Sequence, residues 1–251
     1  MVNSEQKKIS AIIQARMSSE RLPGKVLLPI FGQSVLQHII ERLRFSKLMS
    51  QIILAIPNTK ENDILEKFAL ENSISYYRGS EKEVLERVYL AAKENGCDVV
   101  VEVPADKPLI DPEIIDLTIK QHIDRNSDYT DTSYPSRLLP LGLDVAVLNF
   151  QALDLAYKKA GDTYNRENLT SYFQENPNIF KISKVELPKY FQNPDLRLTL
   201  DTKEDLELIT KIYENLYKKG EFFGTEEVLE FINQKPELTE IYAHIVQRNR
   251  I

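Results

Sequence analysis

Short apolar runs alternate with longer amphipathic stretches along the first half of this sequence, and no other feature restricts the possible folds as strongly. The apolar runs cover residues 9–14, 51–57, 74–78 and 98–104. The intervals between them show helical periodicity at residues 34–46, 61–72 and 81–95. Short β-rich runs separated by helices predict βαβ units around a parallel sheet. We therefore expect an α/β fold in which helices flank the sheet.

Local signals set the expected starts of two helices. Asp111 followed by Pro112 is typical of an N-cap and a first helical position, and predicts a helix that reaches about Arg125. Ser80 and Glu83 have the spacing of a capping box, so the helix of residues 81–95 is expected to begin there.

The second half has a less regular rhythm. Strands are expected at residues 128–134, 144–150, 179–186 and 196–200, and helices at 151–160, 166–176, 202–217 and within 225–251. No repeat, low-complexity segment or change in composition marks a second domain. We therefore expect one domain over residues 1–220, with residues 221–251 as its helical C-terminal extension.

The charge and the cysteine content narrow the functional classes. The 251 residues carry a formal net charge of −6, which argues against nucleic-acid and membrane-surface partners because those surfaces select basic proteins. Cys97 is the single cysteine, so no disulfide can form within the chain. The polar start MVNSEQKK is unlike a secretory signal, and no run approaches the roughly 20 apolar residues of a membrane span. These features predict a cytoplasmic protein.

Three cations stand on a short loop directly after the first apolar run, within the stretch IIQARMSSERLPGKVL. They are Arg16, Arg21 and Lys25. Ligands of open parallel sheets bind beyond the carboxyl ends of the strands, and guanidinium and ammonium groups at that edge suit a polyphosphate. The loop matches neither a Walker A motif nor G-x-G-x-x-G. The alternative is a solvated turn with three surface cations, and spacing alone leaves both interpretations open.

Two aspartates follow other apolar runs and are expected at the same edge. Asp106 follows the run at 98–104 within PADKPLIDP, and Asp201 ends the run at 196–200 within LTLDTKED. Carboxylates there suit Mg²⁺, which prefers oxygen ligands and often bridges a protein carboxylate to substrate phosphates. If the strands share a sheet, one Mg²⁺ is expected between the two aspartates, facing phosphates on the cationic loop. The alternative role for Asp201 is a helix cap, supplied by Asp201 itself or by Thr202.

A weaker group of polar residues lies between these motifs. Gly142, in GLDVAV, permits a close approach of backbone to ligand. Asp144 begins an otherwise apolar run, where a charge is unexpected unless it binds something, and a half-exposed strand position is the alternative. The group also includes Asp162, Tyr164, Arg166 and Glu167.

Six motifs occur in a defined order: QARMSSERLPGKVL, YYRGSEKEVLERV, PADKPLIDPEIID, PLGLDVAV, NRENLT and LTLDTKEDLELI. This series resembles the cytidylyltransferase family that includes the acylneuraminate and 3-deoxy-manno-octulosonate cytidylyltransferases, and looks closest to its branch of spore-coat polysaccharide biosynthesis proteins. The resemblance covers residues 9–217. It implies a Rossmann-like nucleotide-diphospho-sugar transferase fold, with a mixed, mostly parallel sheet flanked by helices and a helical C-terminal tail.

The resemblance also implies a reaction and a set of site residues. A nucleotidyltransferase of this family would couple CTP to a small sugar or sugar-acid acceptor and release pyrophosphate, with Mg²⁺ as cofactor, for surface polysaccharide biosynthesis. By resemblance, Lys25, Arg16 and Asp106 are the catalytic residues, and Asp106 and Asp201 are the metal ligands. The implied nucleotide-binding residues are Gln14, Ala15, Arg16, Ser19, Arg21, Lys25, Arg78, Gly79, Ser80 and Ala105, and the implied acceptor-binding residues are Asp144, Arg166 and Glu167. A homodimer is a further expectation from relatives.

Three positions depart from the family pattern. Ala105 precedes Asp106 where relatives commonly have glycine, which restricts close backbone approach to the nucleotide. Lys107 places a cation beside the expected metal ligand. We expect its side chain in solvent, the alternative being a pair with Asp106 that competes with Mg²⁺. Asn168 stands where relatives often have histidine, and asparagine cannot act as a general base.

Three other functions fit the sequence less well. A nucleotidyltransferase of the same fold that uses another nucleotide or a sugar 1-phosphate usually has a glycine-rich loop after the first strand. A glycosyltransferase would need a D-x-D metal motif, which PADKP does not supply. An inactive nucleotide-binding homologue is the third alternative, which Ala105 and Lys107 would allow.

Overall fold

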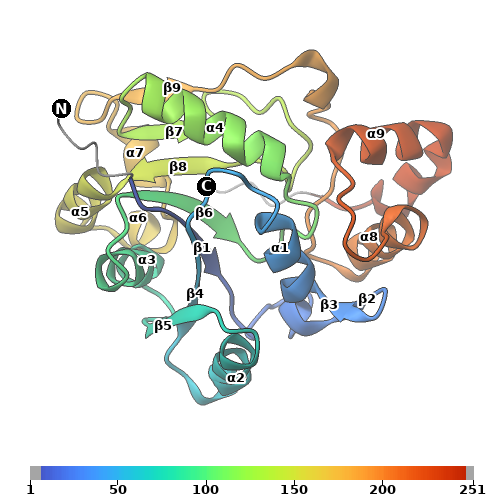
Figure 1. The fold of residues 1–251 in the computed structure, drawn as a ribbon, viewed down its shortest axis with the longest axis horizontal. Helices are drawn as coiled ribbons and strands as arrows, with labels where there is room; N and C mark the ends of the chain where they lie inside the picture. Colours follow the sequence, from blue (N-terminus) through green and yellow to red (C-terminus); the bar gives the residue numbers. More distant parts are fainter. Residues whose placement is uncertain (1–6, 247–251) are drawn as a thin grey trace.

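The computed structural model of the protein describes residues 7–246. Its centre is a seven-stranded sheet with the order β5-β4-β1-β6-β8-β7-β9 (Figure 1). The strands are β1 Ile9–Gln14, β4 Gln51–Pro57, β5 Ser75–Gly79, β6 Val99–Pro104, β7 Tyr129–Asp131, β8 Ala146–Asn149 and β9 Ile182–Lys184. A separate antiparallel pair joins β2 Pro29–Ile30 to β3 Gln33–Ser34.

The pairing within the large sheet is mixed but mostly parallel. β5, β4, β1 and β6 are parallel neighbours, and Ile12 of β1 lies opposite Ile53 on one side and Glu102 on the other. β8 runs antiparallel to both β6 and β7, and β9 pairs in parallel with β7. The predicted βαβ units and the α/β fold class are confirmed. Because their strands are parallel, the carboxyl ends of β1, β4 and β6 meet at one edge of the sheet.

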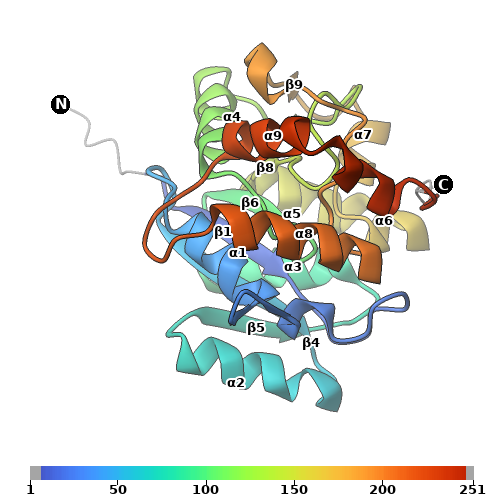
Figure 2. The ribbon, with the colours of Figure 1, turned by 90° about the vertical axis from the view of Figure 1, so that its right-hand side faces the viewer.

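Helices cover both faces of the sheet because the strand side chains alternate between two apolar cores. Ala11 and Ile13 belong to one core and Ile12 belongs to the other. The first core includes residues of α1 Val35–Leu43, α2 Asp63–Glu71, α4 Pro112–Asp124, α8 Lys203–Leu216 and α9 Thr225–Gln234. The second includes residues of α3 Val84–Glu94, α5 Phe150–Lys159 and α7 Ser171–Glu175. Figure 2 shows α8 in orange and α9 in red on the face of the molecule turned toward the viewer.

Shorter helical segments complete the chain. They are α6 Thr163–Glu167 and the 3-10 segments η1 Lys25–Leu27, η2 Lys60–Asn62, η3 Lys189–Phe191 and η4 Pro236–Tyr242. The single helix expected at residues 166–176 is wrong, because α6 and α7 are separate helices whose junction at Asn168 has an extended backbone.

Two of the predicted helix starts are confirmed and one is wrong. The Asp111 carboxylate caps α4 by accepting a hydrogen bond from the backbone N–H of Glu113 at 2.8 Å. Thr202 caps α8, with Asp205 completing a capping box. Ser80 does accept a hydrogen bond from the N–H of Glu83, at 3.1 Å, but this contact closes a turn that precedes the helix. α3 therefore begins later than expected.

The strand expected at residues 196–200 is wrong. Among residues 7–246 this segment makes only an isolated bridge between Leu141 and Arg197. Its remaining backbone bonds go elsewhere: the N–H of Leu198 donates to the carbonyl of Leu141 at 2.7 Å, and the N–H of Leu200 donates to the carbonyl of Asp106 at 2.8 Å. The segment therefore bridges two loops and does not extend the sheet.

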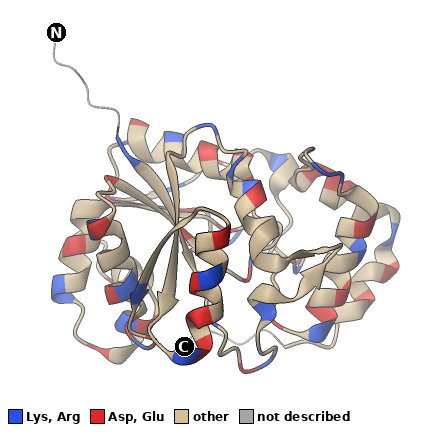
Figure 3. Ribbon diagram, turned by 60° about the horizontal axis from the view of Figure 1, so that its bottom comes forward, with Lys and Arg blue, Asp and Glu red and all other residues tan. Residues whose placement is uncertain are grey.

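The C-terminal helices pack on the same apolar core as the sheet. The N–H of Thr225, at the start of α9, donates to the Asp111 carboxylate at 2.7 Å. The domain boundary at residue 220 stays a prediction, and the part of the expected C-terminal helices at residues 247–251 lies outside the described residues. No helix within residues 7–246 is long and apolar enough to cross a membrane. Figure 3 shows acidic and basic residues interspersed over the outer helices.

Candidate active site

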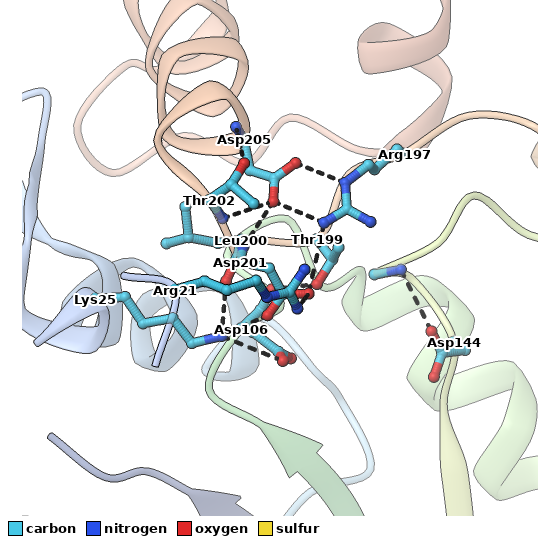
Figure 4. Close-up of polar contacts among 11 residues, drawn as sticks. Arg21, Lys25, Asp106, Asp144, Arg197, Thr199, Leu200, Asp201, Thr202 and Asp205 are labelled. Carbon is cyan, nitrogen blue, oxygen red and sulfur yellow. Dashed lines mark hydrogen bonds and ion pairs between the residues drawn. The ribbon is translucent and has the colours of Figure 1, made fainter. Parts of the chain in front are cut away.

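The cationic loop leaves β1 at the carboxyl edge of the sheet and is folded back on itself. The carbonyl of Met17 accepts hydrogen bonds from the N–H groups of Ser19 and Gly24, both at 3.0 Å. Gly24 has a φ of 68°, a left-handed conformation that favours glycine, and it directly precedes η1. Lys25 is thereby placed at the first position of η1, with its side chain directed toward the centre of the site (Figure 4).

A buried asparagine anchors this loop to the next βα connection. The N–H of Met17 donates to Oδ1 of Asn62 at 2.9 Å, and Asn62 is fully buried in η2. Leu22 and Val26 add apolar anchors in the first core. The loop is therefore held at both ends by packing, which fixes where its cations lie.

The Lys25 ammonium lies among three oxygens from two distant segments (Figure 4). Nζ donates to the carbonyl of Leu200 at 2.8 Å and to Oδ1 of Asp201 at 2.9 Å, and lies 3.5 Å from Oδ2 of Asp106. The two segments meet because the carbonyl of Asp106 also accepts from the N–H of Leu200 and the hydroxyl of Thr199, at 2.8 and 3.2 Å. The predicted convergence of Lys25, Asp106 and Asp201 is thus present in the structure.

Asp201 faces three cations, Lys25, Arg21 and Arg197. Arg21 binds its Oδ2 at 2.9 Å and Arg197 lies 3.5 Å from the same oxygen. Burial by itself would raise the pKa of Asp201, but the positive charges of Lys25, Arg21 and Arg197 outweigh that effect and hold the pKa below its usual range. Because Thr202 caps α8, the Asp201 carboxylate is free of the capping role proposed as its alternative.

A buried ion pair positions Asp201, and neither of its residues was predicted as part of the site. Arg197 donates to both carboxylate oxygens of Asp205, at 2.7 and 2.8 Å. Asp205 also accepts from the backbone N–H groups of Asp201 and Thr202, at 2.8 and 2.9 Å. Asp205 could have been found from the sequence, because it lies three residues after Thr202, the spacing of a capping box. Arg197 could not, because it lies in a segment that was predicted as a strand and is not one.

The residues at this edge surround a cavity of about 730 Å³. Ten predicted site residues line it: Gln14, Ala15, Arg16, Ser19, Arg21, Lys25, Ala105, Asp106, Glu167 and Asp201. Eight others were not assigned a role: Glu20, Val26, Glu81, Lys82, Val84, Arg87, Pro104 and Asn168. The volume and the convergence of charged groups are those of a small-molecule site.

Five predicted site residues are not among the residues that line this cavity: Arg78, Gly79, Ser80, Asp144 and Arg166. Arg78 forms ion pairs with Asp63, at 2.8 Å, and with Glu66 of α2. Arg166 lies 3.5 Å from Glu83 and over the ring of Tyr157. Their roles in binding stay predictions.

Both expectations for Lys107 are wrong. Lys107 is only 6% exposed, and its Nζ donates to the carboxylate and to the carbonyl of Asp144 at 2.6 and 2.7 Å. Burial would lower the pKa of Lys107, but Asp144 and the neighbouring acidic groups raise it. Gly142 serves the same arrangement: its φ is 104°, and a Cβ there would lie 2.6 Å from the backbone N of Thr199. The close approach at Gly142 is to this backbone, where a ligand was expected.

The carboxylates of Asp106 and Asp201 fit the expected Mg²⁺. Both already converge on one cationic group, the Lys25 ammonium. Among the described residues no cluster of three or more histidine, cysteine or acidic side chains could hold a metal ion alone. Mg²⁺ does not need one, since it commonly takes one or two carboxylates and completes its shell with water and substrate phosphates.

An open, mostly parallel sheet with a cationic loop and two carboxylates at its carboxyl edge defines a nucleotide-binding enzyme of the phosphoryl- or nucleotidyl-transfer class. The sequence model of the family described as cytidylyltransferase matches residues 10–228. The chain belongs to this family, and it is a nucleotidyltransferase.

Individual relatives support the assignment over nearly the whole chain. An uncharacterised protein of Methanocaldococcus jannaschii, MJ1063, is 36% identical over 244 residues, which cover 96% of this chain and 97% of that protein. The spore coat polysaccharide biosynthesis protein SpsF of Bacillus subtilis is 32% identical, over 90% of this chain and 94% of that protein. The structure of a cytidylyltransferase from Leptospira borgpetersenii superposes with a TM-score of 0.87 at 28% identity, covering 96% of this chain and all of that one.

Proposed function

We propose that this protein is a Mg²⁺-dependent cytidylyltransferase that couples CTP to a sugar or sugar-acid acceptor, releasing pyrophosphate, for surface polysaccharide biosynthesis. The observation that carries the proposal is the position of Lys25 between Asp106 and Asp201 at the wall of the cavity. Two carboxylates can hold Mg²⁺, and a cation beside them can stabilise negative charge on the nucleotide phosphates, which suits metal-assisted transfer of a nucleotidyl group to an acceptor. The cytidylyltransferase family supports cytosine as the base of the nucleotide, and the similarity to SpsF supports a role in polysaccharide biosynthesis.

The chain's own residues supply positioning and charge. The acceptor hydroxyl oxygen attacks the α-phosphorus of CTP, the bond from that phosphorus to the bridging oxygen breaks, and pyrophosphate leaves. The hydroxyl proton is released to water. Negative charge on the phosphate oxygens grows during this step, and the ammonium of Lys25 and the guanidinium of Arg21 stabilise it. Mg²⁺, when bound by Asp106 and Asp201, supplies further charge stabilisation to the same oxygens.

Two of the three departures from the family pattern, Lys107 and Ala105, do not obstruct this site. Lys107 pairs with Asp144, so its ammonium does not occupy the Asp106 carboxylate. Ala105 is buried, and its N–H donates to the carbonyl of Gln14 at 3.0 Å, which continues the pairing of β1 with β6. These contacts weigh against the inactive homologue as the function of this chain.

The test is thermal stabilisation of the full chain by CTP, UTP, GTP and ATP, each with and without Mg²⁺. A ligand at about 100 times its dissociation constant should add about 2.7 kcal/mol to the free energy of unfolding. A shift selective for CTP and dependent on Mg²⁺ supports the proposal. A selective shift with another nucleotide transfers it to a related nucleotidyltransferase, and no shift with any nucleotide contradicts it.

Three broader expectations belong to the same proposal. The protein is proposed to act in the cytoplasm, to form a homodimer, and to have neither nucleic-acid nor membrane partners. The interspersed acidic and basic residues of the surface support the absence of a nucleic-acid partner. Sedimentation of the full chain tests the dimer, and a monomer at micromolar concentration would contradict it.

A further inference from the structure

The cations that line the cavity differ in their partners. Around Asp201, the three cations Lys25, Arg21 and Arg197 face the three carboxylates of Asp106, Asp201 and Asp205, so their formal charges cancel. Arg16, Lys82 and Arg87 also line the cavity, and within residues 7–246 none of these three cations forms an ion pair with a carboxylate. The acidic residues Glu20, Glu81 and Glu167 line the same cavity. Arg16 and Lys82 are exposed, so Arg87 is the one of these three cations that is held inside the protein at the cavity.

Arg87 is buried without full hydrogen bonding. It is 2% exposed, one guanidinium nitrogen donates to the carbonyls of Ser80 and Glu81, and its Nε has no hydrogen-bond partner. Burial, together with the positive charge of Arg16, lowers the pKa of Arg87 to about 10. The negative charge of Glu81 opposes this lowering, but the Glu81 carboxylate forms no ion pair with Arg87 and accepts a hydrogen bond from the Ser18 hydroxyl. A charge in such a position is costly unless a ligand offsets it.

A second buried arginine shows what offsets this cost elsewhere in the molecule. Arg42 also donates to two carbonyls, those of Ile110 at 2.7 Å and Phe223 at 3.0 Å. The rings of Phe222 and Phe223 lie 4.9 and 4.7 Å from its guanidinium carbon, and this contact stabilises the charge. Arg87 has no such ring contact among the described residues, and it borders a cavity. The comparison separates a structural arginine from one that is available to a ligand.

The amino end of α3 adds to the positive field at the same wall. α3 has 11 residues and begins at Val84, which also lines the cavity. The first turn of a helix favours anions because its N–H groups carry partial positive charge. Glu83, which precedes this turn, has its carboxylate 3.5 Å from Arg166. Arg16, Arg87 and the start of α3 therefore border the same cavity, together with the Glu81 carboxylate.

We infer that Arg87 binds the diphosphate end of the nucleotide, the part that leaves as pyrophosphate, beside Arg16, which the family resemblance already assigns to the nucleotide. This inference rests on the proposed function, since it assigns positions within the same ligand. It explains why an almost fully buried arginine has no carboxylate partner at a wall of the cavity. It also predicts that pyrophosphate binds here without any base or acceptor.

The test is calorimetric titration of the full chain with inorganic pyrophosphate, with and without Mg²⁺. Arg87→Gln, which keeps a hydrogen-bond donor but removes the charge, should weaken binding about 10- to 100-fold. Arg87→Lys, which keeps the charge, should retain most of the affinity. Arg42→Gln is the matched control: it removes a buried arginine bonded to carbonyls, and it should lower thermal stability without changing pyrophosphate affinity. Equal affinity in wild type and folded Arg87→Gln overturns the inference.

Arg16→Gln keeps the inference testable if Arg87→Gln does not fold, because Arg16 is exposed. It should weaken pyrophosphate binding, and unchanged binding overturns the shared site. The two levels of the proposal fail in different ways. If CTP stabilises the wild type but pyrophosphate does not bind, the inference fails and the function stands. If pyrophosphate binds through Arg87 but no nucleotide stabilises the protein, the proposed function fails and the anion site stands.

Discussion

Two lysines near the carboxyl end of β6 both bind carboxylate oxygens, but they differ in how many cations share the carboxylate. Lys25 touches oxygens of three residues, and its principal carboxylate, on Asp201, is shared with two arginines. Lys107 directs its ammonium to one residue, Asp144, through both the carboxylate and the carbonyl. Lys25 therefore shares its carboxylate with other cations, and an incoming phosphate can exchange partners with them. Lys107 instead forms a buried ion pair with Asp144 at some distance from these cations.

The difference arises at two consecutive residues. Asp106 and Lys107 follow β6 after one intervening residue, Ala105, yet the Asp106 carboxylate borders the cavity while Lys107 is buried against Asp144. One strand end thus contributes a carboxylate to the candidate active site and a fixed ion pair to the frame beside it. Substitutions on the two sides should therefore separate activity from stability.

The largest effect is expected from Lys25→Ala. Removing one preorganised charge from a transition state typically costs about 3–4 kcal/mol, so kcat/KM for CTP should fall about a hundred- to a thousandfold. The fold should survive because Asp201 keeps Arg21 and Arg197. Steady-state pyrophosphate release and thermal unfolding measure the two quantities. Lys67→Ala, on the exposed side of α2, is the control and should leave both unchanged. Normal turnover in folded Lys25→Ala protein would exclude the role assigned to Lys25.

Asp106→Asn should reduce turnover about a hundredfold and raise the Mg²⁺ concentration needed for half-maximal rate. The amide keeps the size of the side chain but removes the charge. Asp144→Asn changes a carboxylate on the other side of the same strand end and should leave the Mg²⁺ requirement unchanged. The comparison is made by titrating Mg²⁺ at fixed CTP. An equal rise in the Mg²⁺ requirement of both variants would show that the Asp144 carboxylate affects the metal site as much as Asp106 does.

The sequence predicted the strands that support the site, because strands are recognised from local periodicity. The strands β1 and β4 begin and end where the apolar runs do, and parallel strand ends necessarily bring Lys25 and Asp106 to one edge. The meeting of Asp106 with Asp201 was also predicted, but for a wrong reason. Residues 196–200 reach the site through backbone bonds to loops, which no local pattern records.

Side-chain pairing was predicted less well. Lys107 lies one residue after Asp106, so sequence spacing favoured solvent or that neighbour. Its partner Asp144 is 37 positions away, and the pair depends on how the β7–β8 connection folds back. Arg87 was missed for a similar reason: within an amphipathic helix it has the spacing of an ordinary polar residue, and only the structure shows its burial.

Lys107→Met should act mainly on stability. It removes the ammonium that satisfies Asp144, and hydrogen bonds to charged groups contribute about 1.5–3 kcal/mol, so a loss of about 2 kcal/mol is expected in urea unfolding. Asp144 is partly exposed and can be rehydrated, which keeps the loss below that of a fully buried charge. Turnover per folded molecule should change much less than in Lys25→Ala. A large loss of turnover at unchanged stability would reverse the contrast between the two lysines.

The smallest effect is expected from Tyr213→Phe, which tests a hydrogen bond that holds the loop carrying Asp106 and Lys107. The Tyr213 hydroxyl donates to the carbonyl of Pro108 at 2.6 Å, directly after Asp106 and Lys107, and its loss should cost about 1 kcal/mol. Burial raises the pKa of Tyr213 to about 12, above the value of about 10 in an unfolded chain. The folded protein thus keeps a proton that the unfolded chain loses at high pH. This contribution is complete below about pH 10 and is lost as the pH rises toward 12. The difference in unfolding free energy between wild type and Tyr213→Phe should therefore shrink over that interval, and a constant difference would show that the hydroxyl is not buried in this bond.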